Sequence, residues 1–277
     1  MLIFKRAIEN KIKERFHKGR AILIFGPRQA GKTTLSKKLL EDYGNKGEYF
    51  NCELSSVRNN FEVGKPELIK KMIGDKKVAV LDEAQTVEDI GVILKTFIDT
   101  YPNIQIVATG SSSFDLSNKI NEPLTGRAFE FILYPLSVAE IKQTLGDITL
   151  TDALDFMRLG TYPAVVAEKD PKIKEDILKN LATNYLYKDV YTFESIRNPR
   201  IFENLIKMLA LQIGSLVSVN ELAIALGVSR ATVEKYIKLL EQSYVIKIIR
   251  PFSRNPRNEI KKAFKNASFA TTIKMIY

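Results

Sequence analysis

The sequence predicts an α/β fold, in which helices cover both faces of a parallel sheet, followed by a helical segment and a helix-turn-helix module. Three observations predict it. Short apolar runs alternate with helical patterns over the first half of the chain, as in parallel sheets. A glycine-rich loop joins the first apolar run to a helix. Beyond residue 200 the pattern changes to short, capped helices followed by a strand.

The composition excludes several classes of protein. The 277 residues are 45% hydrophobic and 27% charged, which is ordinary for a globular chain. No apolar run approaches the roughly 18 residues that span a bilayer, and the apolar start before Lys5 is too short for a signal peptide. With one cysteine, Cys52, and one histidine, His17, neither a disulfide framework nor a Cys/His zinc site is expected. We therefore expect a cytoplasmic protein with no membrane partner.

The first elements follow from periodicity. The first 18 residues have the pattern of an amphipathic helix, because Ile8, Ile12 and Phe16 are four residues apart. The apolar run at 21–26 predicts a fully buried strand, and the pattern of 33–41 predicts a helix.

Four more strand-like segments follow, separated by helical patterns. They are expected at residues 48–51, 78–81, 104–109 and 128–133. After Pro135 the strands stop, and residues 136–195 have a helical pattern broken by glycine and proline.

A glycine-rich loop leads from the first strand directly into a helix. Gly26, Gly31, Lys32 and Thr33 fit the pattern G-x-x-x-x-G-K-[ST] in that context. The glycines let successive backbone N–H groups face phosphate oxygens, and the dipole of the following helix points to the same place. The lysine is expected to reach the β and γ phosphates of ATP and to act in catalysis, and the threonine hydroxyl to bind Mg²⁺. The expected nucleotide-binding residues of this P-loop are Gly26, Pro27, Arg28, Gln29, Ala30, Gly31, Lys32, Thr33 and Thr34.

An acidic pair follows the strand at 78–81. Asp82 and Glu83 stand at its carboxyl end, where open α/β sheets bind ligands. Asp82 is expected to hold Mg²⁺, and Glu83 to polarise the water that attacks the γ phosphate. Such a pair alone is also typical of a solvated turn, but here it follows a P-loop. With one strand between the two motifs, we expect a P-loop NTPase sheet of the ATPase branch, with strand order 5-1-4-3-2.

Two further catalytic residues are candidates. Ser111, with Thr109, follows the strand expected between the two motifs, and would act as a sensor of the γ phosphate. The alternative is a plain Gly-Ser turn. Arg127 opens the fifth strand and would be an arginine finger or a nucleotide-sensing residue, acting in its own chain or across a subunit boundary of a homo-oligomer. The alternative is a surface arginine.

Residues 217–252 have the pattern of a helix-turn-helix with a wing. Ser218 and Glu221 form a capping-box pair, Gly227 makes the turn, and Ser229 caps a second helix. In such modules the second helix enters the major groove of DNA and basic residues of the wing hold phosphates. The expected contacts to double-stranded DNA are Arg230, Lys235, Lys238, Arg250 and Arg254. A lid or a dock for a protein is the alternative.

Charge supports this division of the chain. The net charge is +10, of which residues 200–277 carry +8, with 13 Lys and Arg against 5 Asp and Glu. A basic end on a nearly neutral body suggests a polyanion partner, although many basic surfaces only promote solubility. The expected parts are an ATPase core at 1–134, a helical lid at 135–199, a winged helix-turn-helix at 200–262 and an atypical, disordered tail at 263–277.

The motifs occur together in a known family. GPRQAGKTTL, LDEAQ, LTGRAFEFILYPLSVAEI and GTYPAVV, with the helix-turn-helix after them, resemble prokaryotic AAA+-type ATPases that carry a C-terminal domain of unknown function. The resemblance covers residues 1–262 and implies ATP binding and hydrolysis by Lys32, Thr33, Asp82 and Glu83. Family members usually continue into a nuclease-like segment, which this chain lacks after Ala263. A truncated or frameshifted gene is therefore expected.

These observations support one main hypothesis and two alternatives. The main one is a Mg²⁺-dependent ATPase that couples nucleotide state to a DNA-contacting winged helix. The first alternative is a nucleotide-gated DNA-binding regulator with negligible turnover. The second is a remnant of a truncated ATPase gene, without turnover.

Overall fold

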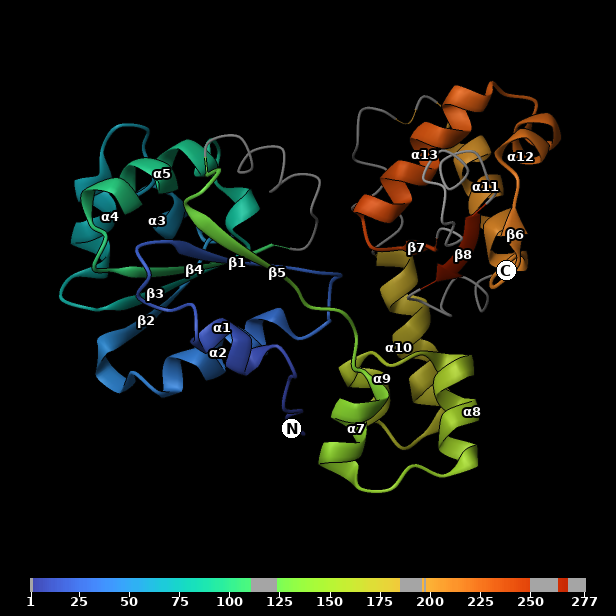
Figure 1. Ribbon diagram of the computed structural model, residues 1–277, viewed down its shortest axis with the longest axis horizontal. Helices are drawn as coiled ribbons and strands as arrows, with labels where there is room; N and C mark the ends of the chain where they lie inside the picture. The colour runs from blue at the N-terminus through green and yellow to red at the C-terminus, as the bar shows by residue number, and fades with distance from the viewer. Residues whose placement is uncertain (1, 111–123, 185–195, 197, 250–263, 269–277) are drawn as a thin grey trace, which may run out of the picture. The chain divides into compact units, whose positions relative to one another are not determined.

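The chain forms two compact units in its computed structural model, Met1–Gly146 and Asp147–Tyr277 (Figure 1). The structure describes residues 2–110, 124–184, 196, 198–249 and 264–268. The first unit extends past the boundary expected at residue 134. It includes the helix that follows, because Glu140 of that helix is bonded to Arg6 near the start of the chain.

A five-stranded parallel sheet is the centre of the first unit. Its strands are β1 (Ala21–Phe25), β2 (Gly47–Asn51), β3 (Val78–Asp82), β4 (Gln105–Gly110) and β5 (Ala128–Ile132). Their order is β2-β3-β4-β1-β5, which confirms the predicted order 5-1-4-3-2. The three inner strands are buried along their whole length, as their apolar runs predict.

Helices lie on both faces of this sheet (Figure 1). On one face lie α1 (Glu9–Lys13) and α2 (Lys32–Glu41); on the other lie α3 (Ser55–Arg58), α4 (Pro66–Ile73) and α5 (Ile90–Thr100). Short 3-10 helices η1 (Gly44–Lys46) and η2 (Ala84–Thr86) precede β2 and follow β3. Ile12 of α1 and Leu35 and Leu39 of α2 pack on Ile22 and Ile24 of β1, so the start of the chain covers the strand that leads into the loop.

The predicted helix over residues 1–18 is wrong in extent. Only five residues, 9–13, are α-helical. The Ala7 N–H donates to the Glu140 carboxylate and not to a backbone carbonyl one turn earlier, as it would inside a helix. His17, with φ of 55°, adopts a left-handed conformation that a helix does not continue through.

The first unit ends in α7 (Val138–Leu145), which begins with a capping box. The Ser137 hydroxyl accepts from the Glu140 N–H at 3.3 Å, and the Glu140 carboxylate accepts from the Ser137 N–H at 2.8 Å. This pair fixes the first turn of α7.

The second unit begins with helices and ends with a small sheet. The helices are α8 (Leu150–Leu159), α9 (Pro163–Ala167), α10 (Pro171–Asn184), α11 (Pro199–Leu211), α12 (Val219–Leu226) and α13 (Arg230–Gln242). The strands β6 (Leu216–Val217), β7 (Ile246–Ile249) and β8 (Phe264–Ser268) form an antiparallel sheet in the order β6-β8-β7. None of the described helices of either unit is long and apolar enough to cross a membrane.

The caps of α12 and α13 and the turn between them are formed by the predicted residues, with the serine half of the capping box at Ser218. Ser218 and Ser229 accept from the backbone N–H groups of Glu221 and Thr232, and Gly227, with φ of 65°, ends α12 in the left-handed conformation. Tyr236 of α13 packs edge-on against Phe202 of α11, with ring centroids 5.2 Å apart.

The prediction of a disordered tail at 263–277 is wrong for residues 264–268. These residues form β8, the central strand of the antiparallel sheet, because β6 and β7 offer backbone partners on both of its sides. The strand lies beyond the apparent end of the family pattern at residue 262, where the sequence has no strong alternation to reveal it.

Candidate nucleotide-binding site

The loop between β1 and α2 has the backbone that its glycines predict. Gly26 has φ of 150°, and a Cβ at this position would lie 2.1 Å from the Leu133 carbonyl oxygen. Gly31, with φ of 96°, is the N-cap of α2. Both conformations are accessible to glycine and strained for other residues. The loop therefore depends on these two glycines.

Gly26→Ala is expected to lower the free energy of unfolding by about 3 kcal/mol, because the Cβ would overlap backbone that has no room to move. Gly74→Ala is the matched control, since Gly74, with φ of 63° and ψ of −133°, is also strained for alanine but has no atom within 4 Å of a Cβ; backbone strain alone, about 1 kcal/mol, is expected there. Urea unfolding of both variants measures the difference. Equal losses would contradict the role of the Leu133 carbonyl.

Lys32 is buried within the loop. Its side chain is 5% exposed, and its Nζ donates to the carbonyl oxygens of Gly26 and Pro27, both at 2.9 Å. The ammonium thus lies at the mouth of the loop, next to the carboxyl end of β1. Arg28, Gln29 and Thr34 are exposed, and Ala30 is buried.

The structure brings Thr33 and Asp82 together, as the sequence predicts for a Mg²⁺ site. The Thr33 hydroxyl donates to Asp82 Oδ2 at 2.8 Å. A hydroxyl and a carboxylate side by side are hard oxygen donors, and Mg²⁺ in nucleotide sites is held by few protein oxygens, completed by water and phosphates. These two residues therefore fit the ion. The described residues contain no cluster of three or more His, Cys, Asp and Glu that would form a denser metal site.

Asp82 has two further partners, and the sequence predicted neither bond. The Thr109 hydroxyl donates to Oδ1, and the Tyr49 hydroxyl donates to Oδ2 at 2.6 Å. Burial, together with this bond to Asp82, raises the pKa of Tyr49 above its ordinary value, so the phenol stays a donor. Tyr49 lies on β2, next to β3, and only the strand order could have pointed to it. Asp82 is thus held from three sides.

Glu83 has a strained backbone and a bound side chain. Its φ of 53° and ψ of 44° are left-handed, its N–H donates to Thr109 Oγ1 at 3.1 Å, and its Oε2 accepts from the Gln85 side-chain amide. Strain of this kind costs of order 1–3 kcal/mol and persists where surrounding structure fixes it. Here the bond to Thr109 and the turn of η2 fix it.

The prediction that Arg127 reaches the phosphates of its own chain is wrong. Arg127 immediately precedes β5, whose first residue pairs with Ala21 at the start of β1. The strands are parallel, so Arg127 lies at the edge of the sheet opposite the loop, on the order of 15 Å away along the strand. There its Nε donates to Asp99 at 2.8 Å, and the side chain is exposed. Within this chain it has the exposed, paired side chain of a surface arginine, and its action across a subunit boundary stays a prediction.

The remaining predicted residues belong to the second unit or lie outside the described residues. Ser111, Arg250 and Arg254 are among the latter. Arg230 at the start of α13 is exposed and donates from Nε to Glu234 Oε1 at 2.8 Å, so a carboxylate partly neutralises it. Lys235 and Lys238 are exposed on the same helix.

Comparison with known families divides the chain near residue 146, where the two compact units also meet along the sequence. Residues 18–142 match a family model described as an AAA domain. Residues 150–269 match a second model, described as a domain of unknown function (DUF8612). The second match extends beyond residue 262, where the resemblance was expected to end, and includes β8.

Several curated relatives are similar over most of this chain. A protein of Methanocaldococcus jannaschii is 28% identical over an alignment of 272 positions that covers 90% of this chain and 58% of the relative. One from Mycobacterium tuberculosis is 27% identical over 259 residues, 92% of this chain and 55% of the relative. One from Haemophilus influenzae is 29% identical over 181 residues, and the match covers 62% of this chain and 45% of the relative. All three are named as uncharacterized proteins, and this chain spans about half their length.

Two solved structures are similar at lower identity. A signal transduction ATPase with numerous domains and a tetratricopeptide repeat sensor, from Pyrococcus horikoshii, is 12% identical with a TM-score of 0.41, over 99% of this chain and 42% of that one. The Pif1 helicase of Candida albicans is 16% identical with a TM-score of 0.34, and the match covers 66% of this chain and 55% of the helicase. The AAA match and the loop geometry support an AAA-type P-loop domain in the first unit and indicate nucleotide binding.

Proposed function

We propose that the first unit binds ATP with Mg²⁺ and hydrolyses it. One observation carries the proposal: the Thr33 hydroxyl and the Asp82 carboxylate lie 2.8 Å apart at the carboxyl edge of the sheet, beside a glycine loop that encloses Lys32. This combination supplies backbone donors and a cation for phosphates, and oxygen ligands for the ion that accompanies them.

Each residue has a role that follows from its chemistry. Lys32 leaves its carbonyl partners to reach phosphate oxygens, since an ammonium on a four-carbon stem turns easily. Thr33 and Asp82 would hold Mg²⁺, which neutralises phosphate charge when it is bound. Tyr49 and Thr109 keep the Asp82 carboxylate oriented. Glu83 orients water for attack.

Phosphate release by the purified chain is the direct test. We expect steady-state release of inorganic phosphate from ATP that requires Mg²⁺ and is lost with EDTA. ATP binding without release at any Mg²⁺ concentration would contradict hydrolysis and leave binding intact.

We further propose that the second unit is a winged helix that contacts double-stranded DNA, with α13 in the major groove. The order α11, β6, α12, α13, β7, β8 with a three-stranded antiparallel sheet supports this assignment. The +8 charge of residues 200–277 and the exposed Lys235 and Lys238 supply the positive surface that DNA phosphates require.

Replacing Lys235 and Lys238 together with alanine is expected to weaken binding to duplex DNA and to reduce the slope of log K against log salt by about 2, one unit for each phosphate that is no longer neutralised. Lys172→Ala with Lys179→Ala is the matched control, because both lysines are exposed on α10 of the same unit. Fluorescence anisotropy across a salt series measures both. An unchanged slope in the α13 variant would contradict DNA binding by this helix.

A nucleotide-gated DNA-binding regulator with negligible turnover is the second candidate function. The bond from the Gln85 amide to the Glu83 carboxylate favours it, because a glutamate held by a neighbour orients water less readily. In a regulator, ATP changes DNA affinity equally in the wild type and in Glu83→Gln. In an ATPase that needs turnover, Glu83→Gln locks the affinity at its ATP-bound value.

A further inference from the structure

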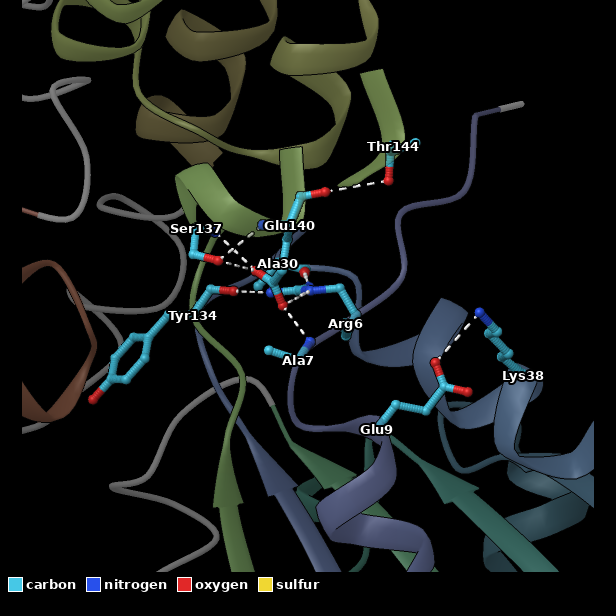
Figure 2. Close-up of polar contacts among 9 residues, drawn as sticks. All are labelled: Arg6, Ala7, Glu9, Ala30, Lys38, Tyr134, Ser137, Glu140 and Thr144. Carbon is cyan, nitrogen blue, oxygen red and sulfur yellow. Dashed lines mark hydrogen bonds and ion pairs between the residues drawn. The ribbon is translucent and has the colours of Figure 1, made fainter. Parts of the chain in front are cut away.

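Arg6 is a buried cation that binds three separate parts of the first unit (Figure 2). Its side chain is 7% exposed and lies in the segment before α1. Nη1 donates to the Ala30 carbonyl oxygen in the P-loop at 2.7 Å, and Nε donates to Glu140 Oε1 on α7 at 3.1 Å. Nη2 donates to the Tyr134 carbonyl oxygen, just after β5. The planar fork of one guanidinium thus joins the loop to α7 and the strand exit.

Glu140 is fixed as firmly as the arginine it binds. Its Oε1 also accepts from the Ala7 N–H at 2.7 Å, and its Oε2 accepts from the Ser137 N–H at 2.8 Å and the Ser137 hydroxyl at 3.0 Å. Burial acts to raise the pKa of Glu140, but the two backbone bonds and the charge of Arg6 lower it below its ordinary value. The carboxylate is therefore ionised at neutral pH, and Arg6 has an anchored counterion.

The bond to Ala30 sets the direction of a peptide group in the loop. The described residues contain no cis peptide bond, so the Ala30 carbonyl and the Gly31 N–H point in opposite directions across one plane. The carbonyl faces Arg6, outside the loop. The Gly31 N–H is turned the other way, as a P-loop needs if that N–H is to bind phosphate.

We propose that Arg6 is a positioning residue for the phosphate loop, anchored by Glu140, and that it holds the Gly31 N–H toward the nucleotide. This inference rests on the ATP-binding function proposed above. Lys32 bonds to the carbonyls of Gly26 and Pro27 at one end of the loop, and Arg6 bonds to the carbonyl of Ala30 at the other. A loop ordered in advance binds phosphate without the ordering entropy that a flexible loop loses at that moment.

Arg6→Lys is the informative variant. It keeps a positive charge beside Glu140, but one ammonium does not reproduce the fork that reaches Ala30, Tyr134 and Glu140 together. We expect the Kd of a non-hydrolysable ATP analogue, measured with Mg²⁺ present, and the KM for ATP to rise about tenfold. A tenfold change corresponds to the loss of one net hydrogen bond. The kcat is expected to change less than about threefold, because Arg6 does not touch the reacting atoms.

Glu9→Gln is the matched control. Glu9 is also a buried carboxylate of the first unit, and it pairs with Lys13 at 3.1 Å and Lys38 at 3.3 Å without a bond to the loop (Figure 2 shows the Lys38 pair). The Glu9→Gln variant is expected to have a lower melting temperature and an unchanged Kd for the ATP analogue. Glu140→Gln is the second test variant, and it is expected to raise the Kd as Arg6→Lys does. Because the two residues act together, the Kd of the double variant Arg6→Lys with Glu140→Gln is expected to rise by about the larger of the two single effects.

Hydrogen exchange at residues 26–31 separates this inference from the proposed function, since it needs no nucleotide. We expect faster exchange there in Arg6→Lys and Glu140→Gln than in Glu9→Gln. Faster exchange in a chain that binds no ATP would sink the ATP-binding proposal and keep the positioning role. Unchanged loop exchange together with an unchanged Kd in both Arg6→Lys and Glu140→Gln would overturn the positioning role.

Discussion

Lys32→Ala is expected to weaken binding of ATP with Mg²⁺ by a factor of about 100 to 1,000 and to abolish measurable phosphate release. Lys32 is the buried cation of the loop, 5% exposed, and its removal leaves the phosphates without their compensating charge. The carbonyl oxygens of Gly26 and Pro27 also lose a donor, which adds negative potential where phosphates bind. Binding of a fluorescent ATP analogue measures the loss.

Lys11→Ala is the control for the charge change. Lys11 is exposed on α1, so its loss alters the net charge of the unit by the same amount without touching the loop. Melting temperatures of both variants establish that each is folded. Tight ATP binding by a folded Lys32→Ala variant would rule out this loop as the nucleotide site.

Glu83→Gln is expected to bind ATP as the wild type does and to lower kcat by a factor of about 100 to 10,000, the usual contribution of a general base. The amide keeps the size of the side chain and a carbonyl oxygen that accepts from Gln85. The left-handed backbone at position 83 is therefore expected to stay as it is. Only the ability to take a proton from water is removed. Single-turnover hydrolysis, measured beside the Kd, separates the two effects.

Glu88→Gln is the control here, because Glu88 is an exposed glutamate just beyond η2. It is expected to leave both binding and turnover unchanged. If Glu83→Gln turns over at the wild-type rate with ATP bound, the water must be oriented by another group.

The sheet and the core of the site could be predicted because their signals are local. The strand that contains residues 21–25 is an uninterrupted apolar run, and the loop after it has a fixed spacing. Those two facts place Lys32 and Thr33, and the acidic end of the next apolar run places Asp82. The strand order then followed from counting one strand between the two motifs.

The errors arose where direction or distance along the chain decided the outcome. Arg127 immediately precedes β5, whereas the phosphate loop follows β1. Because β1 and β5 are parallel, the start of one strand and the end of the other lie at opposite edges of the sheet. Tyr49 and Arg6 have no pattern of their own, because their bonds to Asp82 and Glu140 connect residues 33 and 134 positions apart. The strand at 264–268 depends on partners at 216–217 and 246–249, which no local pattern reveals.

The position of β1 in the sheet has a consequence for synthesis of the protein on the ribosome. Both neighbours of β1, β4 and β5, come later in the chain, as do Leu133, against which Gly26 packs, and Glu140, which anchors Arg6. The phosphate loop is therefore among the first segments translated and among the last to acquire its shape, since the last of its supports, Glu140, comes more than 100 residues after it. A nascent chain that ends before β4 would contain the whole loop motif without either neighbour of β1, and one that ends before Glu140 would lack the anchor of Arg6.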